Sequence, residues 1–96
     1  MIDRAEAIER ARQAIAAIPD PTSAGYTLVV ETAEEHRFGW LFFYESREYL
    51  RTGELMHRLF GNAPLIVDRR DGRTTFVPTG RPLRDAIREY DEQWQP

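Results

Sequence analysis

Hydrophobic residues recur at helical spacing near both ends of the chain and at strand spacing between them. The N-terminal set is separated by steps of three and four residues, as on one face of a helix: Ile8, Ala11, Ile15 and Ile18. Asp3 can cap this helix, with Glu6 three residues later as in a capping box. Pro19, Asp20 and Pro21 should end it, because proline lacks the backbone N–H that a helix needs.

The C-terminal segment repeats the helical pattern. Pro82 stands where the first turn of a helix tolerates proline. The apolar residues that follow it again share one face: Leu83, Ala86, Ile87, Tyr90 and Trp94. A second helix is therefore predicted from residue 82 onward.

Four runs between the helices are rich in β-branched and aromatic residues and are predicted as strands: residues 26–31, 38–45, 64–69 and 73–78. The polar, acidic residues 32–37 are predicted as the turn between the first two. Asp71 and Gly72 indicate a tight hairpin between the last two, because such a turn needs positive φ. Short connections favour an antiparallel meander. We therefore predict one α+β domain over residues 1–96: a helix, a four-stranded antiparallel meander and a helix.

The second predicted strand is apolar on both faces. Alternation places four aromatic residues on one face: Phe38, Trp40, Phe42 and Tyr44. Leu41 and Phe43 fall on the other face. Such a strand is usually central and covered on both sides, so a second cover is needed, and residues 46–63 are predicted to supply it.

Residues 46–63 form a long connection that should carry structure or function of its own. Its apolar residues are too numerous for a solvated linker: Tyr49, Leu50, Leu55, Met56, Leu59 and Phe60. A short helix is predicted over residues 54–60. Gly61 and Asn62 suit its left-handed C-terminal end.

Composition narrows the class of protein. The net charge is −3, with 13 basic and 16 acidic residues, and this balance argues against a nucleic-acid binder. All basic residues are arginine, and the absence of cysteine excludes disulfides and thiolate metal sites. No apolar run approaches the ~20 residues that span a bilayer, and residues 1–4 lack the apolar core of a signal peptide. We expect a cytoplasmic protein without membrane contact.

The sequence contains few signs of a catalytic site. His36 and His57 lie outside any metal-ligand motif, and a turn histidine and a helix-surface histidine are the simpler interpretation. Ser23 and Ser46 lie outside a nucleophile elbow. Phosphate-cradling glycine motifs are absent from the sequence. We therefore predict no catalytic residue, no metal ligand and no cofactor.

Charged and aromatic clusters have two interpretations each. The acidic groups are either solvated faces or a surface for a basic partner: Glu31, Glu34 and Glu35, and then Asp85, Glu89, Asp91 and Glu92. The aromatic face of the second strand is either core or a ligand-stacking platform, and Tyr44, at the strand end, is its residue most apt to reach the surface. Tyr49 and Arg51 either anchor the long connection or form a binding hot spot.

Two strings, GWLFFYESREYLRTGE and GNAPLIVDRRDG, resemble the immunity protein 35 family, also called YrhB-like. The shared pattern is Gly-Trp, an aromatic strand ending in Tyr, a Tyr-Leu-x-Thr-Gly loop, Gly-Asn-x-Pro, a hydrophobic strand and Asp-Gly. It falls here on Gly39, Trp40, Phe43, Tyr44, Tyr49, Leu50, Thr52, Gly53, Gly61, Asn62, Pro64, Ile66, Val67, Asp68 and Gly72. The specific part covers about a third of the chain, and the flanking helices fit in order and length.

The resemblance implies a bacterial immunity protein of a polymorphic-toxin system, with an α+β fold and no catalytic residues. Its partner would be a cognate protein toxin. The residues assigned a structural role are Gly39, Trp40, Gly53, Gly61, Asn62, Pro64, Asp68 and Gly72. The residues expected to bind the partner are Tyr44, Arg47, Tyr49, Arg51 and Glu54.

Two other classes stay open on the sequence. A chaperone-like or general protein-binding module would use Leu55, Met56 and Phe60 as exposed apolar surface. An enzyme would need the glutamates of residues 31–35, or the histidines, to converge in a pocket.

Overall fold

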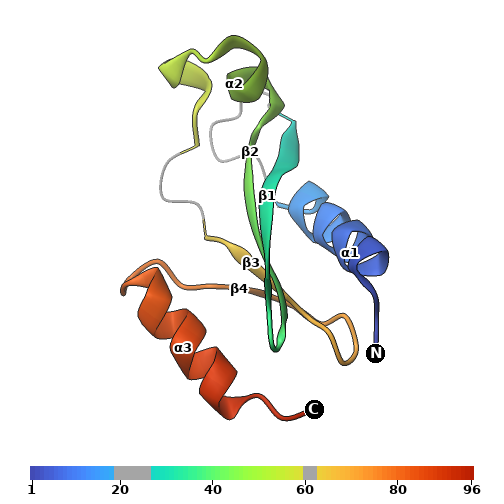
Figure 1. Ribbon diagram of the computed structural model, residues 1–96. Coiled ribbons are helices and arrows are strands. Elements are labelled where there is room, and N and C mark those ends of the chain that lie inside the picture. The colour runs from blue at the N-terminus through green and yellow to red at the C-terminus, as the bar shows by residue number, and fades with distance from the viewer. Residues whose placement is uncertain (19–26, 60–62) are drawn as a thin grey trace.

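The computed structural model describes residues 1–18, 27–59 and 63–96. Its elements follow the predicted order: α1 (Arg4–Ala16), β1 (Leu28–His36), β2 (Gly39–Ser46), α2 (Arg47–Thr52), the 3-10 turn η1 (Leu55–His57), β3 (Leu65–Asp68), β4 (Thr74–Phe76) and α3 (Leu83–Gln93). Within the described residues the strands form one antiparallel sheet in the order β1-β2-β3-β4. The α+β meander with a helix at each end is thus confirmed (Figure 1).

Helix α1 begins as predicted. The Asp3 side chain accepts a hydrogen bond from the Glu6 backbone N–H at 2.8 Å. Ala7, Ala11 and Ile15 are buried against the sheet. The predicted stop at residues 19–21 lies outside the described residues.

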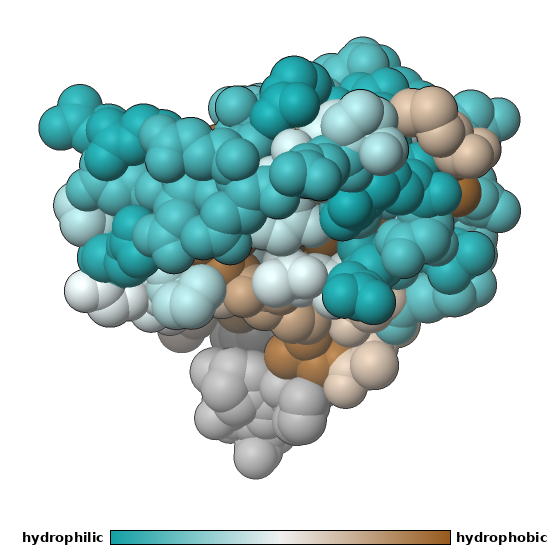
Figure 2. All heavy atoms as spheres, turned by 90° about the horizontal axis from the view of Figure 1, so that it is seen from below, coloured by the Kyte–Doolittle hydropathy of each residue, from teal (hydrophilic) through white to brown (hydrophobic). Residues whose placement is uncertain are grey.

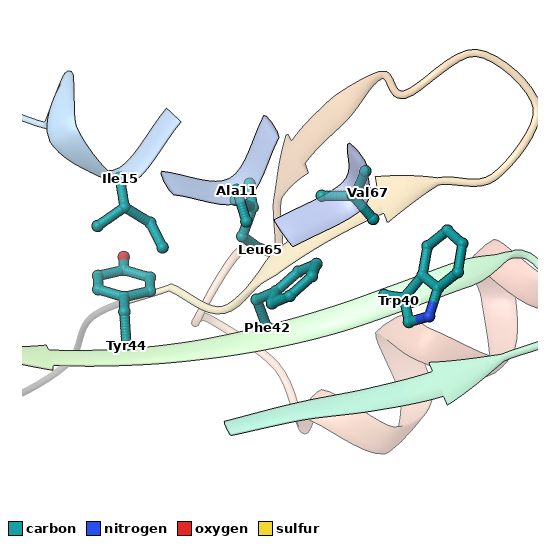
Figure 3. Close-up of a cluster of buried hydrophobic side chains, with 8 residues drawn as sticks. Ala11, Ile15, Trp40, Phe42, Tyr44, Leu65 and Val67 are labelled. Carbon is teal, nitrogen blue, oxygen red and sulfur yellow. The ribbon is translucent and has the colours of Figure 1, made fainter. Parts of the chain in front are cut away.

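The first face of the sheet packs against α1. Figure 3 shows Ala11 and Ile15 of α1 facing Phe42 and Tyr44 of β2. Trp40 lies on the same face of β2 and belongs to the same buried cluster, as do Leu65 and Val67 of β3. Of the two interpretations of the aromatic face, core packing is therefore confirmed for Trp40 and Phe42, and Tyr44 is core as well.

Phe38 does not join that face. It lies in the turn before β2 and packs in a second cluster with Leu41 and Ile66. The prediction failed because Gly39, at φ +145°, interrupts the strand alternation. A Cβ on Gly39 would lie 2.1 Å from the Val67 carbonyl oxygen, so the position admits no side chain without a backbone shift.

Helix α3 covers the part of the second face nearer the hairpin turn, and the prediction that residues 46–63 cover it was wrong for that part. Of that connection, Arg58 and Leu59 line a cavity with Phe43 and Glu45, and residues 60–62 lie outside the described residues. All five residues of the predicted helical face pack in the second cluster: Leu83, Ala86, Ile87, Tyr90 and Trp94. Figure 1 shows α1 and α3 on opposite sides of the sheet, with α3 near the strand ends that carry the turns. The periodicity of α3 identified the face of the helix that packs on the sheet but not which face of the sheet it would cover.

The β1–β2 hairpin is longer than predicted. Strand β1 continues to His36, which pairs with Gly39, so residues 32–36 are strand and not turn. Strand β1 is at the edge of the sheet, where Glu31, Glu34 and Glu35 remain exposed, so polar residues there do not end a strand. The register shifts between Val30 and Thr32, the position of a β-bulge.

The β3–β4 hairpin is as predicted. Gly72 has φ +78°, and its N–H donates to the Asp68 carbonyl oxygen at 2.9 Å. The Arg10 side chain lies against Gly72, about 3.1 Å from where a Cβ would stand. Figure 2 views the end of the molecule that carries the hairpin turns and both termini, and this end is mostly hydrophilic.

Candidate protein-binding site

The connection between β2 and β3 folds into a lobe at the opposite end from the termini (Figure 1). We name residues 47–58 the α2–η1 lobe. It contains helix α2, which was not predicted, and η1 stands where a helix over residues 54–60 was predicted. Gly61 and Asn62, assigned to the end of that helix, lie outside the described residues.

Two buried polar side chains at the end of β2 tie the lobe to the sheet. Ser46 caps α2 by accepting a hydrogen bond from the Tyr49 N–H at 3.0 Å, and its hydroxyl donates to the His57 carbonyl oxygen. Glu45 accepts hydrogen bonds from the Ser46 N–H at 3.0 Å and the Leu59 N–H at 2.8 Å. Both ends of the lobe are therefore held by adjacent residues of one strand.

Further contacts fix the shape of the lobe. Gly53 ends α2 at φ +73°, a left-handed conformation that favours glycine. The Thr52 hydroxyl donates to the Glu48 carbonyl oxygen at 2.8 Å. The Arg58 guanidinium lies 5.6 Å from the centre of the Tyr49 ring. A surface fixed in this way loses little conformational entropy on binding.

The lobe exposes three large apolar side chains among charged ones. Leu50 is 46% exposed, Leu55 65% and Met56 73%. Arg47 and Arg51 are exposed on the same segment. Clustered exposed apolar side chains commonly mark a protein-binding surface.

The predicted partner-binding residues separate into two groups. Arg47, Arg51 and Glu54 are exposed on the lobe, and Tyr49 is half-buried beneath Arg58. Tyr44 is only 6% exposed, so the expectation that it reaches the surface was wrong. Its ring packs in the first core cluster, where burial raises the pKa of the phenol.

Asp68 is the most connected of the residues assigned a structural role. It is 1% exposed and accepts hydrogen bonds from the Tyr90 hydroxyl at 2.8 Å and the Trp94 Nε1–H at 3.1 Å. Arg70 Nη2 donates to it at 2.9 Å. Burial alone would raise the pKa of Asp68, but the hydrogen bonds from Arg70, Tyr90 and Trp94 together hold it well below its usual range. Burial and the hydrogen bond to Asp68 raise the pKa of Tyr90 to about 12.

Sequence reasoning missed Glu45 and Ser46 as the anchors of the lobe. A Ser that follows a strand and precedes a helical stretch is a recognisable N-cap signal. The role of Glu45 has no such local signal, because its partner Leu59 lies 14 residues away.

The carboxylates considered for catalysis do not converge. Glu35 pairs with Arg69 at 3.0 Å, whereas Glu31 and Glu34 line two different cavities. Within the described ranges, His, Asp and Glu side chains form no cluster of three or more that could hold a metal ion. None of the helices described is long and apolar enough to cross a membrane.

The structure is that of a small α+β protein in which the α2–η1 lobe is exposed and is held in place by Glu45 and Ser46. The chain is a member of the immunity protein 35 family, whose model matches residues 5–94. It is also similar to the uncharacterized protein YrhB of Escherichia coli strain K12, with 42% identity over 53 residues. That alignment covers 55% of this chain and 56% of YrhB, so it spans about half the length of the relative. No solved structure matches the chain significantly.

Proposed function

We propose that this chain is a bacterial immunity protein that neutralises a cognate protein toxin by non-catalytic contact. Family membership carries the proposal, because the family is one of immunity proteins. The anchored lobe supports it, since it offers a fixed apolar surface with exposed arginines. Binding would take place in the cytoplasm, before the toxin reaches its target.

The contact surface would centre on Leu50, Leu55 and Met56. Binding energy at interfaces is concentrated in a few side chains that become buried in the complex. Arg47 and Arg51 beside them can form planar, paired hydrogen bonds with carboxylates of the toxin. The hydrogen bonds of the buried Glu45 and Ser46 side chains would hold this surface in one conformation before the toxin binds.

The test uses the toxin domain encoded by the reading frame that adjoins the gene. Co-expression of this chain should rescue growth, and the purified proteins should form a complex in calorimetry. Leu55→Glu/Met56→Glu should weaken binding by at least ~30-fold and abolish rescue. It should change the free energy of unfolding by less than about 1 kcal/mol, because both side chains are exposed.

The control is Thr79→Glu/Gln95→Glu, which adds two carboxylates at exposed positions away from the lobe. It should bind as the wild type does. A lethal toxin domain that the wild-type protein neither binds nor neutralises would contradict the proposal. Equal affinity of the lobe variant and the control would remove the lobe from the interface.

The exposed side chains of Leu55 and Met56 also favour a second function, a chaperone-like module without a dedicated partner. Such a protein would suppress aggregation of unrelated unfolded clients at stoichiometric concentration. Light scattering of heated citrate synthase separates the two functions. Suppression of aggregation that the lobe variant loses, without any toxin binding, would support the chaperone.

A further inference from the structure

Phe43 is only partly buried, which is unusual for its place in the sheet. It lies in the middle of β2, a central strand in which every other residue is buried. Phe43 packs against the second cluster, but α3 covers only the part of this face nearer the hairpin turn. An aromatic ring is thus left half-open on an otherwise closed strand.

Two cavities meet at this ring. One, of about 450 Å³, is lined by Phe43 with Glu31, Glu45 and Leu59. The other, of about 400 Å³, is lined by Phe43 with Leu41 and by side chains of α3. Leu41, Phe43 and Glu45 alternate along β2 and therefore share the second face of the sheet. Both cavities include this face at Phe43, and the first also reaches Tyr44 and Leu59 of the first cluster. We name the two cavities together the Phe43 trough.

The floor of the trough is apolar at its centre. Leu41 and Phe43 of β2 and Leu83 and Ile87 of α3 line the cavity beside the helix. Concave sites with apolar floors and a few polar groups at their edges are the usual form of binding pockets. The trough can accept an apolar side chain that is inserted from outside.

The charges around the trough are partly compensated. Glu45 pairs with Arg58 at 3.8 Å, and Asp91 with Arg37 at 3.1 Å. On the α3 side, Arg88 lies near two carboxylates, at 3.5 Å from Asp85 and 3.9 Å from Glu92. Arg84, also on that side, has no carboxylate within ion-pair distance among the described residues.

The β1 side of the trough carries an excess of negative charge. Glu31 has no ion-pair partner in the described part of the chain, and Glu34 lies 3.3 Å from His36, which is charged only when protonated. Both glutamates are exposed at the edge strand of the sheet. A partner with a cation at this position would meet complementary charge.

We propose that the Phe43 trough receives an apolar side chain of the toxin that is flanked by an arginine or lysine. The apolar group packs on Phe43 and Leu41, and the cation lies along the edge strand β1, where both Glu31 and Glu34 are exposed and attract it. The inference rests on the proposed toxin-binding function and names a second contact within it.

The trough and the α2–η1 lobe form one continuous surface. Arg58 and Leu59, at the foot of the lobe, line the trough beside Phe43. Arg58 also lies over the ring of Tyr49, so the lobe and the trough share a side chain. A toxin that covers the lobe can reach the trough without a second binding event.

The experiment compares two variants with the same change in charge. Glu31→Arg/Glu34→Arg reverses the β1 side of the trough, whereas Glu6→Arg/Glu9→Arg reverses two exposed glutamates of α1 that line neither cavity. The probe is the toxin domain from the adjoining reading frame, and calorimetry measures its dissociation constant. We expect the trough variant to bind at least ~10-fold more weakly than the control variant.

The outcomes separate the two proposals. If the wild type does not bind the toxin domain, the proposed function fails and the trough contact fails with it. If the wild type binds, but the trough variant stays within threefold of the control, the trough contact is overturned while toxin binding stands. Should the arginine variant not fold, Glu31→Gln/Glu34→Gln tests the same contact. It should then weaken binding at least threefold, and an unchanged affinity would overturn the inference.

Discussion

Asp68 shows how much of this fold depends on one carboxylate. It lies at the end of β3, and it binds Tyr90 and Trp94 at the C-terminal end of the chain. The same carboxylate also accepts hydrogen bonds from the Arg70 side chain. One residue thus joins the sheet to the end of α3.

We predict that Asp68→Ala lowers the free energy of unfolding by about 3 kcal/mol. The substitution leaves the buried Trp94 and the partly buried Tyr90 without the acceptor of their hydrogen bonds, and an unpaired buried polar group is costly. Urea denaturation at pH 7 measures the loss. Asp85→Ala, which removes a partly exposed carboxylate, is the control and should cost less than 1 kcal/mol. A loss below 1 kcal/mol for Asp68→Ala would show that the network adds little to stability.

The lowered pKa of Asp68 also predicts the response to acid. On acidification the unfolded chain takes up this proton first, near pH 4, and the folded protein does so only at lower pH. The contribution of Asp68 is therefore complete above about pH 4 and declines as pH falls toward the folded pKa. Urea denaturation from pH 6 to pH 2 should show a steeper loss for the wild type than for Asp68→Asn. Parallel curves would contradict the assignment.

The sequence could not reveal this network. It marked Asp68 as part of a family pattern, but Tyr90 lies 22 residues away and Trp94 26 residues away. Periodicity placed Tyr90 and Trp94 on an apolar helix face without showing what their polar groups would bind. Contacts between distant residues depend on how the elements pack, and no local spacing encodes them.

At the scale of elements, prediction succeeded where the signal was local. The Asp3 cap, the Asp71-Gly72 turn and the buried face of α3 each depend on residues a few positions apart. The turn between β1 and β2 was misplaced because exposed residues are polar both in an edge strand and in a turn, so their sequence does not distinguish the two. The cover of the second face was misassigned because apolar residues 50, 55 and 56 are exposed on the lobe rather than buried.

We predict that Ser46→Ala loosens the lobe while the sheet remains folded. The change removes the cap of α2 and the tie to His57, and loss of an N-cap costs about 1 kcal/mol. Hydrogen exchange should become faster at residues 49–57 and stay unchanged in β3. The matched control is Thr79→Ala, since Thr79 also carries a hydroxyl, is exposed and lies outside the lobe. Unchanged exchange in the lobe would mean that Ser46 is not needed to hold it in place.

At the scale of the whole molecule, two hydrophobic clusters of the described residues share the central strands β2 and β3. Trp40, Phe42, Leu65 and Val67 face one cluster, and Leu41 and Ile66 face the other. Neighbouring residues of β2 and β3 therefore serve opposite faces. Loss of either cluster would expose the strands that support the other.

This arrangement predicts cooperative unfolding. The chain has two tryptophans, Trp40 in the first cluster and Trp94 in the second. In Trp94→Phe, fluorescence reports on the α1 face, and in Trp40→Phe it reports on the α3 face. Within each variant, the fluorescence and far-UV circular dichroism transitions in urea should coincide. Separate midpoints in either variant would show that one helix detaches before the sheet unfolds.

The anchoring of the lobe from β2 has a consequence for diversification. Glu45 and Ser46 hold the lobe through backbone groups of residues 46, 49, 57 and 59, whatever side chains those residues carry. The outward side chains of residues 50, 51, 55 and 56 take no part in these bonds. Substitution of all four side chains would therefore leave the lobe anchored. The same scaffold can be adapted to a new target by changes at these four positions of the α2–η1 lobe.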